Sequence, residues 1–167
     1  VSCGSLTMSA TTSTGARKDV ITISTGTLTV SGNVTTGTTG CQIAFSGAGV
    51  WNMGGAFSGG PLAFTAGTGT VNYNGGGDQA VSAYAYNNLV FSGGGAKAMP
   101  AGASVTGNLS IAPTGNAKAS VAAGQNLSVD TLTLGGTLQV AGTWGSSSSS
   151  ADIPNDTFFA ATTGYLT

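Results

Sequence analysis

The chain lacks the side chains on which most enzymes depend. It contains no histidine and no glutamate, and only nine of its 167 residues are charged, four Lys or Arg and five Asp. Histidine, glutamate, aspartate and cysteine are the usual groups that exchange a proton or hold a metal near neutral pH. Without histidine or glutamate, and with few lysines, no base is available to activate a serine as a nucleophile. We therefore expect no enzymatic activity, no catalytic residue, no metal site and no cofactor.

Charge is scarce in both signs. The net charge is −1 and charged residues make up 5% of the chain, so nothing attracts the protein to nucleic acid. No apolar run reaches the roughly 20 residues of a membrane helix, and no basic-then-apolar signal segment opens the chain. A surface of hydroxyls, amides and backbone offers little repulsion between copies. We expect a protein that is neither bound to nucleic acid nor membrane-spanning and that tolerates contact with itself.

The two cysteines, Cys3 and Cys41, do not have the spacing of a metal site. A disulfide between them is the prediction, because secreted proteins of this size commonly carry one. It would close a loop of nearly forty residues and contribute about 3–4 kcal/mol. A reactive dithiol is the alternative. The disulfide interpretation places the protein outside the cell.

Glycine is frequent along the whole chain, with 29 residues, and disfavours helices. No stretch repeats apolar residues at the spacing of a helix face. Instead, short alternating or aliphatic runs recur between Gly, Asn and Ser, which predicts an all-β fold. The runs are residues 20–23, 27–30, 43–45, 62–64, 70–73, 89–91, 109–111, 127–129, 131–134 and 137–140.

The strands also repeat. The segment Asn88–Phe91 is echoed first by Asn108–Ile111 and then, at a similar spacing, by Asn126–Val129. One coil of a β-solenoid uses about 20 residues, so this period predicts a single β-solenoid, or β-helix, of about eight coils of short parallel strands. Residues 1–167 form one domain in this interpretation: N-terminal coils with both cysteines (1–49), repeat coils (50–142), and a loop plus C-terminal strands (143–167).

Two local patterns bear on how the strands connect. Residues 131–134 and 137–140 flank Gly135-Gly136, which we interpret as two faces of one coil joined by a tight corner. Asn74-Gly75 follows the strand-like run 70–73 and favours a β-hairpin. This second pattern leaves an antiparallel β-sandwich open as the alternative fold.

Residues 86–99 (YNNLVFSGGGAKAM) resemble the "YNNLTLSGSGTKTL" element of long repetitive bacterial surface proteins, and residues 64–75 (FTAGTGTVNYNG) resemble the companion "FTAGTGTVTYNG" element. Segment 142–159 is similar to the part that closes such modules. The resemblance covers about residues 50–167. It implies a secreted or cell-surface β-solenoid of adhesin or filament type from a bacterium, and it carries over no catalytic residue.

These observations predict a structural protein. No covering helix or charged edge is visible at either end, and uncovered solenoid ends stack on copies. We expect an extracellular filament or fibrous surface protein whose subunits join head to tail by strand addition. The predicted contacts join Leu6 and Met8 to Phe158, Phe159, Tyr165 and Leu166 of the next copy, so that removing residues 157–167 abolishes filaments. The alternative is an adhesin or carbohydrate-binding module that binds cell-surface or matrix polysaccharide through its aromatic residues.

Overall fold

The structure is a computed structural model that describes residues 1–10, 18–60 and 62–167. All regular elements in these residues are β-strands, as predicted. Accordingly, the part of the chain described contains no helix of the length and hydropathy needed to cross a membrane. The chain divides into two compact units, Val1–Val71 and Asn72–Thr167, and each is described by itself.

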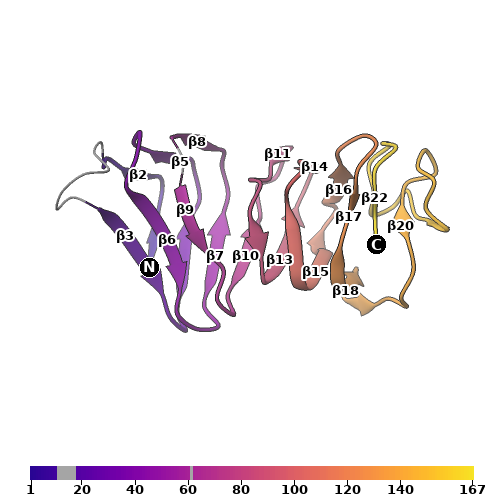
Figure 1. Cartoon of the computed structure of the whole chain (residues 1–167), viewed down its shortest axis with the longest axis horizontal. Coiled ribbons are helices and arrows are strands. Elements are labelled where there is room, and N and C mark those ends of the chain that lie inside the picture. Colours follow the sequence, from indigo (N-terminus) through magenta and orange to yellow (C-terminus); the bar gives the residue numbers. More distant parts are fainter. Residues whose placement is uncertain (11–17, 61) are drawn as a thin grey trace. The chain divides into compact units, whose positions relative to one another are not determined.

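The first unit stacks its strands into three parallel sheets, which form the three sides of successive coils (Figure 1). Each sheet takes one strand from each of three coils. The sheets are β1 (Ser2–Cys3), β4 (Thr27–Val30) and β7 (Val50–Met53); β2 (Leu6–Met8), β5 (Val34–Thr36) and β8 (Phe57–Gly59); and β3 (Asp19–Ile23), β6 (Cys41–Phe45) and β9 (Leu62–Thr65).

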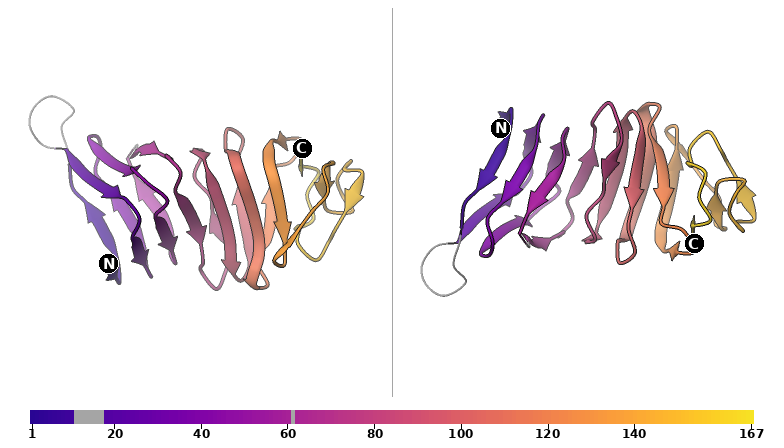
Figure 2. Two further views of the ribbon diagram at one scale, coloured as in Figure 1. Left: turned by 90° about the horizontal axis from the view of Figure 1, so that it is seen from below. Right: turned by 90° about the horizontal axis from the view of Figure 1, so that it is seen from above.

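Equivalent residues of successive coils lie above one another in this unit. Thr27 pairs with Val50 and Cys41 pairs with Leu62, so each coil is close in length to the predicted period. Every second side chain of a strand points inward and is buried, so the interior consists of columns of apolar side chains. Two views in Figure 2 show these strands side by side.

The second unit continues the same principle with longer strands. Its elements are β10 (Thr70–Tyr73, which crosses the unit boundary), β11 (Gln79–Ala80), β12 (Ala85–Tyr86), β13 (Asn88–Gly93), β14 (Ala96–Met99), β15 (Ser104–Gly115), β16 (Lys118–Val121), β17 (Asn126–Leu127) and β18 (Val129–Leu134). Strands β13, β15 and β18 pair in parallel, and so do β11, β14 and β16. Leu89, Leu109 and Leu132 form one buried column.

The protein is therefore a β-solenoid, as predicted, and the sandwich alternative is wrong. It has about five turns rather than eight, because residues 135–167 leave the stack and because coils such as the one from Thr27 to Val50 are longer than 20 residues. The Asn74-Gly75 pair does not make a hairpin either: the strands on its two sides, β10 and β11, belong to different sheets.

Two sequence interpretations in the second unit fail. The third repeat copy is misplaced, since Leu132 rather than Leu127 stacks on Leu109. The Gly135-Gly136 pair joins β18 to β19 (Thr137–Leu138) as an antiparallel hairpin and not as a coil corner. Both glycines have positive φ, 55° and 84°, as a two-residue hairpin turn of type I′ requires.

The predicted disulfide is not formed. Both cysteines are free thiols: Cys3, half-buried on β1, donates to the carbonyl of Thr29 at 3.8 Å, and Cys41, buried on β6, donates to the carbonyl of Met8 at 3.5 Å. Cys3 stacks on Val30, whereas Cys41 lies between Asp19 and Leu62 in another sheet. The sequence alone does not show that the two cysteines lie in different sheets.

Candidate assembly surfaces

The first coil has partners on one side only within the described residues. Strands β1, β2 and β3 each pair with the second coil, through β4, β5 and β6, and no described strand pairs with their other edges. All three strands are parallel to their partners, so each free edge would accept another strand in parallel orientation. These edges match the edges by which one coil of this solenoid pairs with the next.

The backbone hydrogen bonds identify the groups on these edges. The carbonyls of Cys3, Met8 and Ile23 accept hydrogen bonds from the second coil. Alternate residues of a parallel strand direct their N–H and C=O groups to opposite neighbours. The N–H and C=O groups of the intervening residues, Thr7 and Val20, therefore point to the free edge, as do those of Ser2 and Thr22.

An apolar cavity of about 450 Å³ opens inside the three edges. It is lined by inward side chains of the first coil, among them Leu6, Ile21 and Ile23, and by Leu28 of the second. Val20 on the outside of β3 is 48% exposed, which is high for a large apolar side chain in a strand. The interior columns of the solenoid thus end in an apolar mouth that no other described residue covers.

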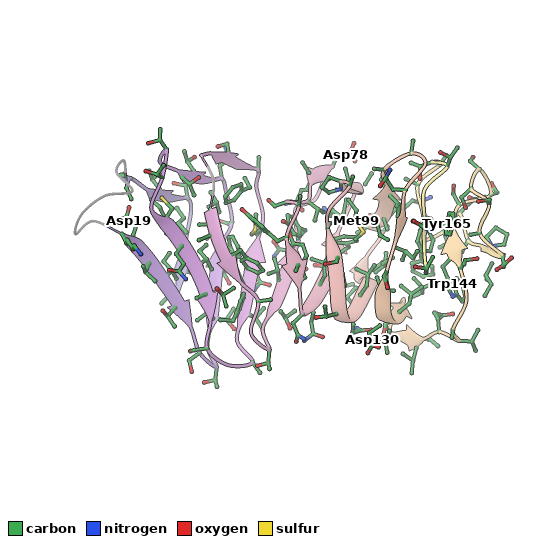
Figure 3. All side chains as sticks on the ribbon, viewed as in Figure 1. Asp19, Asp78, Met99, Asp130, Trp144 and Tyr165 are labelled. Carbon is green, nitrogen blue, oxygen red and sulfur yellow. The ribbon has the colours of Figure 1, made fainter. Side chains whose placement is uncertain are left out.

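In the second unit, residues 135–167 cover the outer edges of the last coil. Strand β22 (Tyr165–Leu166) lies between β17, to which it is parallel, and β20 (Trp144–Gly145), to which it is antiparallel; β20 also pairs with β21 (Ile153–Pro154). Figure 3 shows Trp144 and Tyr165 together in this segment. We refer to residues 143–167 as the cap. The expectation that nothing covers this end is wrong.

The cap is joined to the stack mainly through its backbone. The amide of Ala119 on β16 donates to Phe158 and its carbonyl accepts from Ala160, both at 2.8 Å. Thr167 donates to the carbonyl of Leu127 and accepts from the amide of Val129, both at 2.9 Å. Hairpin strand β19 occupies the edge of β18. All three edges of the last coil, on β16, β17 and β18, are therefore in use.

The predicted contact residues do not all lie on free surfaces. Phe159 and Leu166 are 2% and 1% exposed because they pack within their own chain, and Phe158 and Tyr165 are half-buried there. On the first coil, Met8 is buried and Leu6 lines the open mouth. Of the two groups that we expected to meet across a subunit boundary, the C-terminal one thus pairs within its own chain. The N-terminal one lies on the first coil, whose outer strand edges have no partner among the described residues.

Lys97 on β14 is a buried charged residue that the sequence analysis missed. It is fully buried, and its Nζ donates to the carbonyls of Gly75 and Gly77 at 2.9 Å and to Oε1 of Gln79 at 2.8 Å. Burial lowers the pKa of Lys97, and the nearby Asp78 carboxylate opposes this by raising it. Figure 3 places Asp78 on the outside and Met99, two positions after Lys97, inside.

The contacts of Lys97 suit a structural role. Three oxygen acceptors match the three protons of an ammonium group. They come from the glycine-rich corner 74–79 of the preceding coil, where the Gly75 carbonyl also accepts from the amide of Gly94 at 3.0 Å. The signal in the sequence was its position: in Ala96-Lys97-Ala98-Met99, alternation places Lys97 on the same inward face as Met99.

Four of the large aromatic side chains considered for sugar binding are buried. Trp51, Tyr73 and Tyr86 are each 1% exposed, and Trp144 is 7% exposed. The hydroxyls of Tyr73 and Tyr86 lie 2.9 Å apart, and Tyr86 donates to the carbonyl of Ser82. Burial, with the neighbouring Tyr73, strongly raises the pKa of Tyr86. These rings belong to the core.

Metal-ligating side chains are dispersed. No three residues among His, Cys, Asp and Glu come together in the described ranges. Asp19 accepts a hydrogen bond from the amide of Ala10, and Asp156 accepts one from the amide of Ser147. That bond is the main reason that the pKa of Asp156 is lowered. Each of these two carboxylates therefore bonds a backbone amide nine residues away along the chain.

No family model, no curated protein and no solved structure matches this chain. The geometry of the first coil and of the cap is therefore the basis for a functional proposal.

Proposed function

We propose that this protein is a structural unit of an extracellular filament or fibrous bacterial surface protein, and that its first coil is the surface by which it joins another copy. The joint adds β1, β2 and β3, strand by strand, to the matching edges of a coil in that copy. Because the two contact surfaces differ, the contact is head to tail and can propagate.

One observation carries the proposal: three parallel strand edges surround an apolar mouth at the first coil. A single bound peptide could satisfy one edge, but only another coil presents three strands, one for each sheet, that can each lie about 4.8 Å from β1, β2 and β3. The same addition would cover the apolar mouth. Main-chain hydrogen bonds would supply cohesion, and the inward side chains would supply register.

Two features of the sequence support this function. The net charge of −1 offers almost no repulsion between copies. The resemblance of residues 64–75 and 86–99 to repeats of bacterial surface proteins supports the extracellular location.

The test compares two substitutions of Thr7, an exposed residue in β2 whose N–H points to the free edge. Thr7→Pro removes that N–H, whereas Thr7→Ala keeps it and loses only the side chain. We expect wild type and Thr7→Ala to form regular filaments on long incubation at high concentration, and Thr7→Pro to remain monomeric. Sedimentation velocity and negative-stain microscopy give the readout, and circular dichroism checks that all three are folded.

Filaments of the folded Thr7→Pro variant in undiminished amount would refute the proposed joint, since a joint through β2 needs its outward N–H. Salt gives a further check: assembly that depends on pairing of uncharged edges should change little with ionic strength.

A further inference from the structure

The cap occupies the surface that a second copy needs. A first coil that adds to a stack pairs with the outer edges of the last coil, and these edges lie on β16, β17 and β18. In the second unit all three already have partners from residues 135–167. Strand β22 pairs with β17 in parallel, the orientation that a strand of an incoming coil would take.

We propose that residues 143–167 are an autoinhibitory cap, and that the edge beneath it is the docking surface for the first coil of a second copy. This rests on the proposed function, because the occupant is the coil described there. Cap and incoming coil compete for the same backbone groups, so a chain accepts a partner only while its cap is displaced. The cap therefore sets how readily filaments start and grow.

The packing of the cap fits a displaceable element. Its strands β20, β21 and β22 have two residues each, so few ladder hydrogen bonds hold it. A groove of about 260 Å³ runs beside the cap, lined in part by Leu132, Leu138 and Trp144. Leu138 is 67% exposed, so this side of the contact is open to solvent.

A few contacts anchor the cap nonetheless. Leu166 is 1% exposed and pairs with Leu127, and a Cβ at Gly164 would overlap the carbonyl oxygen of Ala122. Lys118 donates to the carbonyl of Asp156 at 2.6 Å, and the hydroxyl of Thr163 accepts from the amide of Gly124 at 3.0 Å. A substitution at Leu166 or Gly164 should thus loosen the cap and leave the coils intact.

The test uses the full chain with Leu166→Asp, which places a carboxylate in an apolar contact, and Gly164→Val as an independent second variant. The control is Gly76→Ala, a glycine in the same unit with open space around its Cβ. Amide hydrogen exchange at Tyr165 and Thr167 reports whether the cap has opened. Apparent affinity scales with the fraction of competent chains, so the critical concentration for filaments should fall at least about tenfold in both variants. It should not change in Gly76→Ala.

The double variant Leu166→Asp/Thr7→Pro separates docking from misfolding. Filaments that disappear in the double variant support a joint between the exposed edge and the first coil. Aggregates that persist in it overturn the inference, because they form without the first coil.

A peptide of residues 143–167 added in excess should slow growth of Leu166→Asp filaments by covering open ends; growth unaffected by the peptide contradicts the inference. An open cap with the wild-type critical concentration would refute autoinhibition alone, whereas wild type and variants that never assemble would refute the proposed function.

Discussion

Replacing Lys97 with methionine tests how the solenoid tolerates a charge in its interior. Methionine keeps much of the length and flexibility of the side chain but cannot donate a hydrogen bond. The change leaves the carbonyls of Gly75 and Gly77 and the side-chain oxygen of Gln79 without their ammonium donor. Gln79 Oε1 still accepts from the amide of Gly75 at 2.8 Å, so its loss is partial.

The expected magnitude follows from two opposing effects. Each hydrogen bond to a charged group contributes about 1.5–3 kcal/mol, and three are lost. Burying an ammonium group costs several kcal/mol, and the variant avoids that penalty. The free energy of unfolding should therefore fall by about 2–4 kcal/mol, which for a urea m-value of about 2 kcal/mol/M lowers the urea midpoint by roughly 1–2 M.

Lys118→Met is the matched control. Lys118 makes one hydrogen bond at the surface, to the carbonyl of Asp156, so its loss should cost less than about 1 kcal/mol. The assay is urea unfolding of wild type and both variants, followed by tyrosine and tryptophan fluorescence. A Lys97→Met midpoint equal to or above that of Lys118→Met would show that the glycine-rich corner does not depend on the ammonium group.

The pH dependence gives a second readout of the same residue. Burial places the pKa of folded Lys97 below its ordinary value of 10.5. Between these two values the unfolded chain binds more protons than the folded chain, so the contribution of Lys97 to stability increases with pH in that window. The difference in midpoint between wild type and Lys97→Met should thus widen as pH rises toward 10.5, and a narrowing difference would contradict the direction of the shift.

Two further predictions concern the first unit. Gly69→Ala should lower stability by about 1–3 kcal/mol, because its Cβ would overlap the buried ring of Phe45, whereas Gly26→Ala has open space and should stay within about 0.5 kcal/mol; equal thermal midpoints would argue against the close packing. In a thiol titration, Cys3 should react in the native state and Cys41 only after unfolding, with reductant leaving the melting temperature unchanged; a chain without titratable thiols would instead carry the disulfide.

The fold was predictable because its cause is local and repeated. Alternation of apolar and polar residues in short runs fixes strands, and the sequence spacing from Leu89 to Leu109 is the observed coil length at that point. The columns then follow, since equivalent inward residues must lie above one another. Helix was excluded by glycine alone.

The two wrong predictions in the second unit come from sequence patterns that are compatible with more than one structure. The segment Asn126–Val129 resembles Asn108–Ile111, but Leu132 occupies the stacked position because the coil is longer there than the one before it. Positive φ at Gly135 and Gly136 suits a coil corner and a hairpin equally, so only pairing distinguishes them.

The pairing of the cap and the burial of Lys97 could not be predicted from the sequence for a different reason. Strands as short as β20 and β22 show no periodicity; β22 is held by pairing with β17, and β20 by pairing with β22. Lys97 occupies an inward position, where a lysine is normally excluded unless oxygen acceptors surround it. Those acceptors belong to the preceding coil, and only the stacking of coils brings them close.

The two edges of the stack differ in how they are protected against pairing. Natural sheets protect free edges with charged residues, proline, bulges or a cover. The last coil has a cover, the cap. On the first coil the residues whose backbone points to the free edge are Ser2, Thr7, Val20 and Thr22, and none is charged or a proline. Val20 even exposes an apolar side chain there. A chain that covers one edge with a whole segment (143–167) and has no charge or proline at these four positions of the other fits a unit whose growth is controlled at the capped edge. The substitution Val20→Lys would supply the missing protection, and its effect on filament formation should equal that of Thr7→Pro.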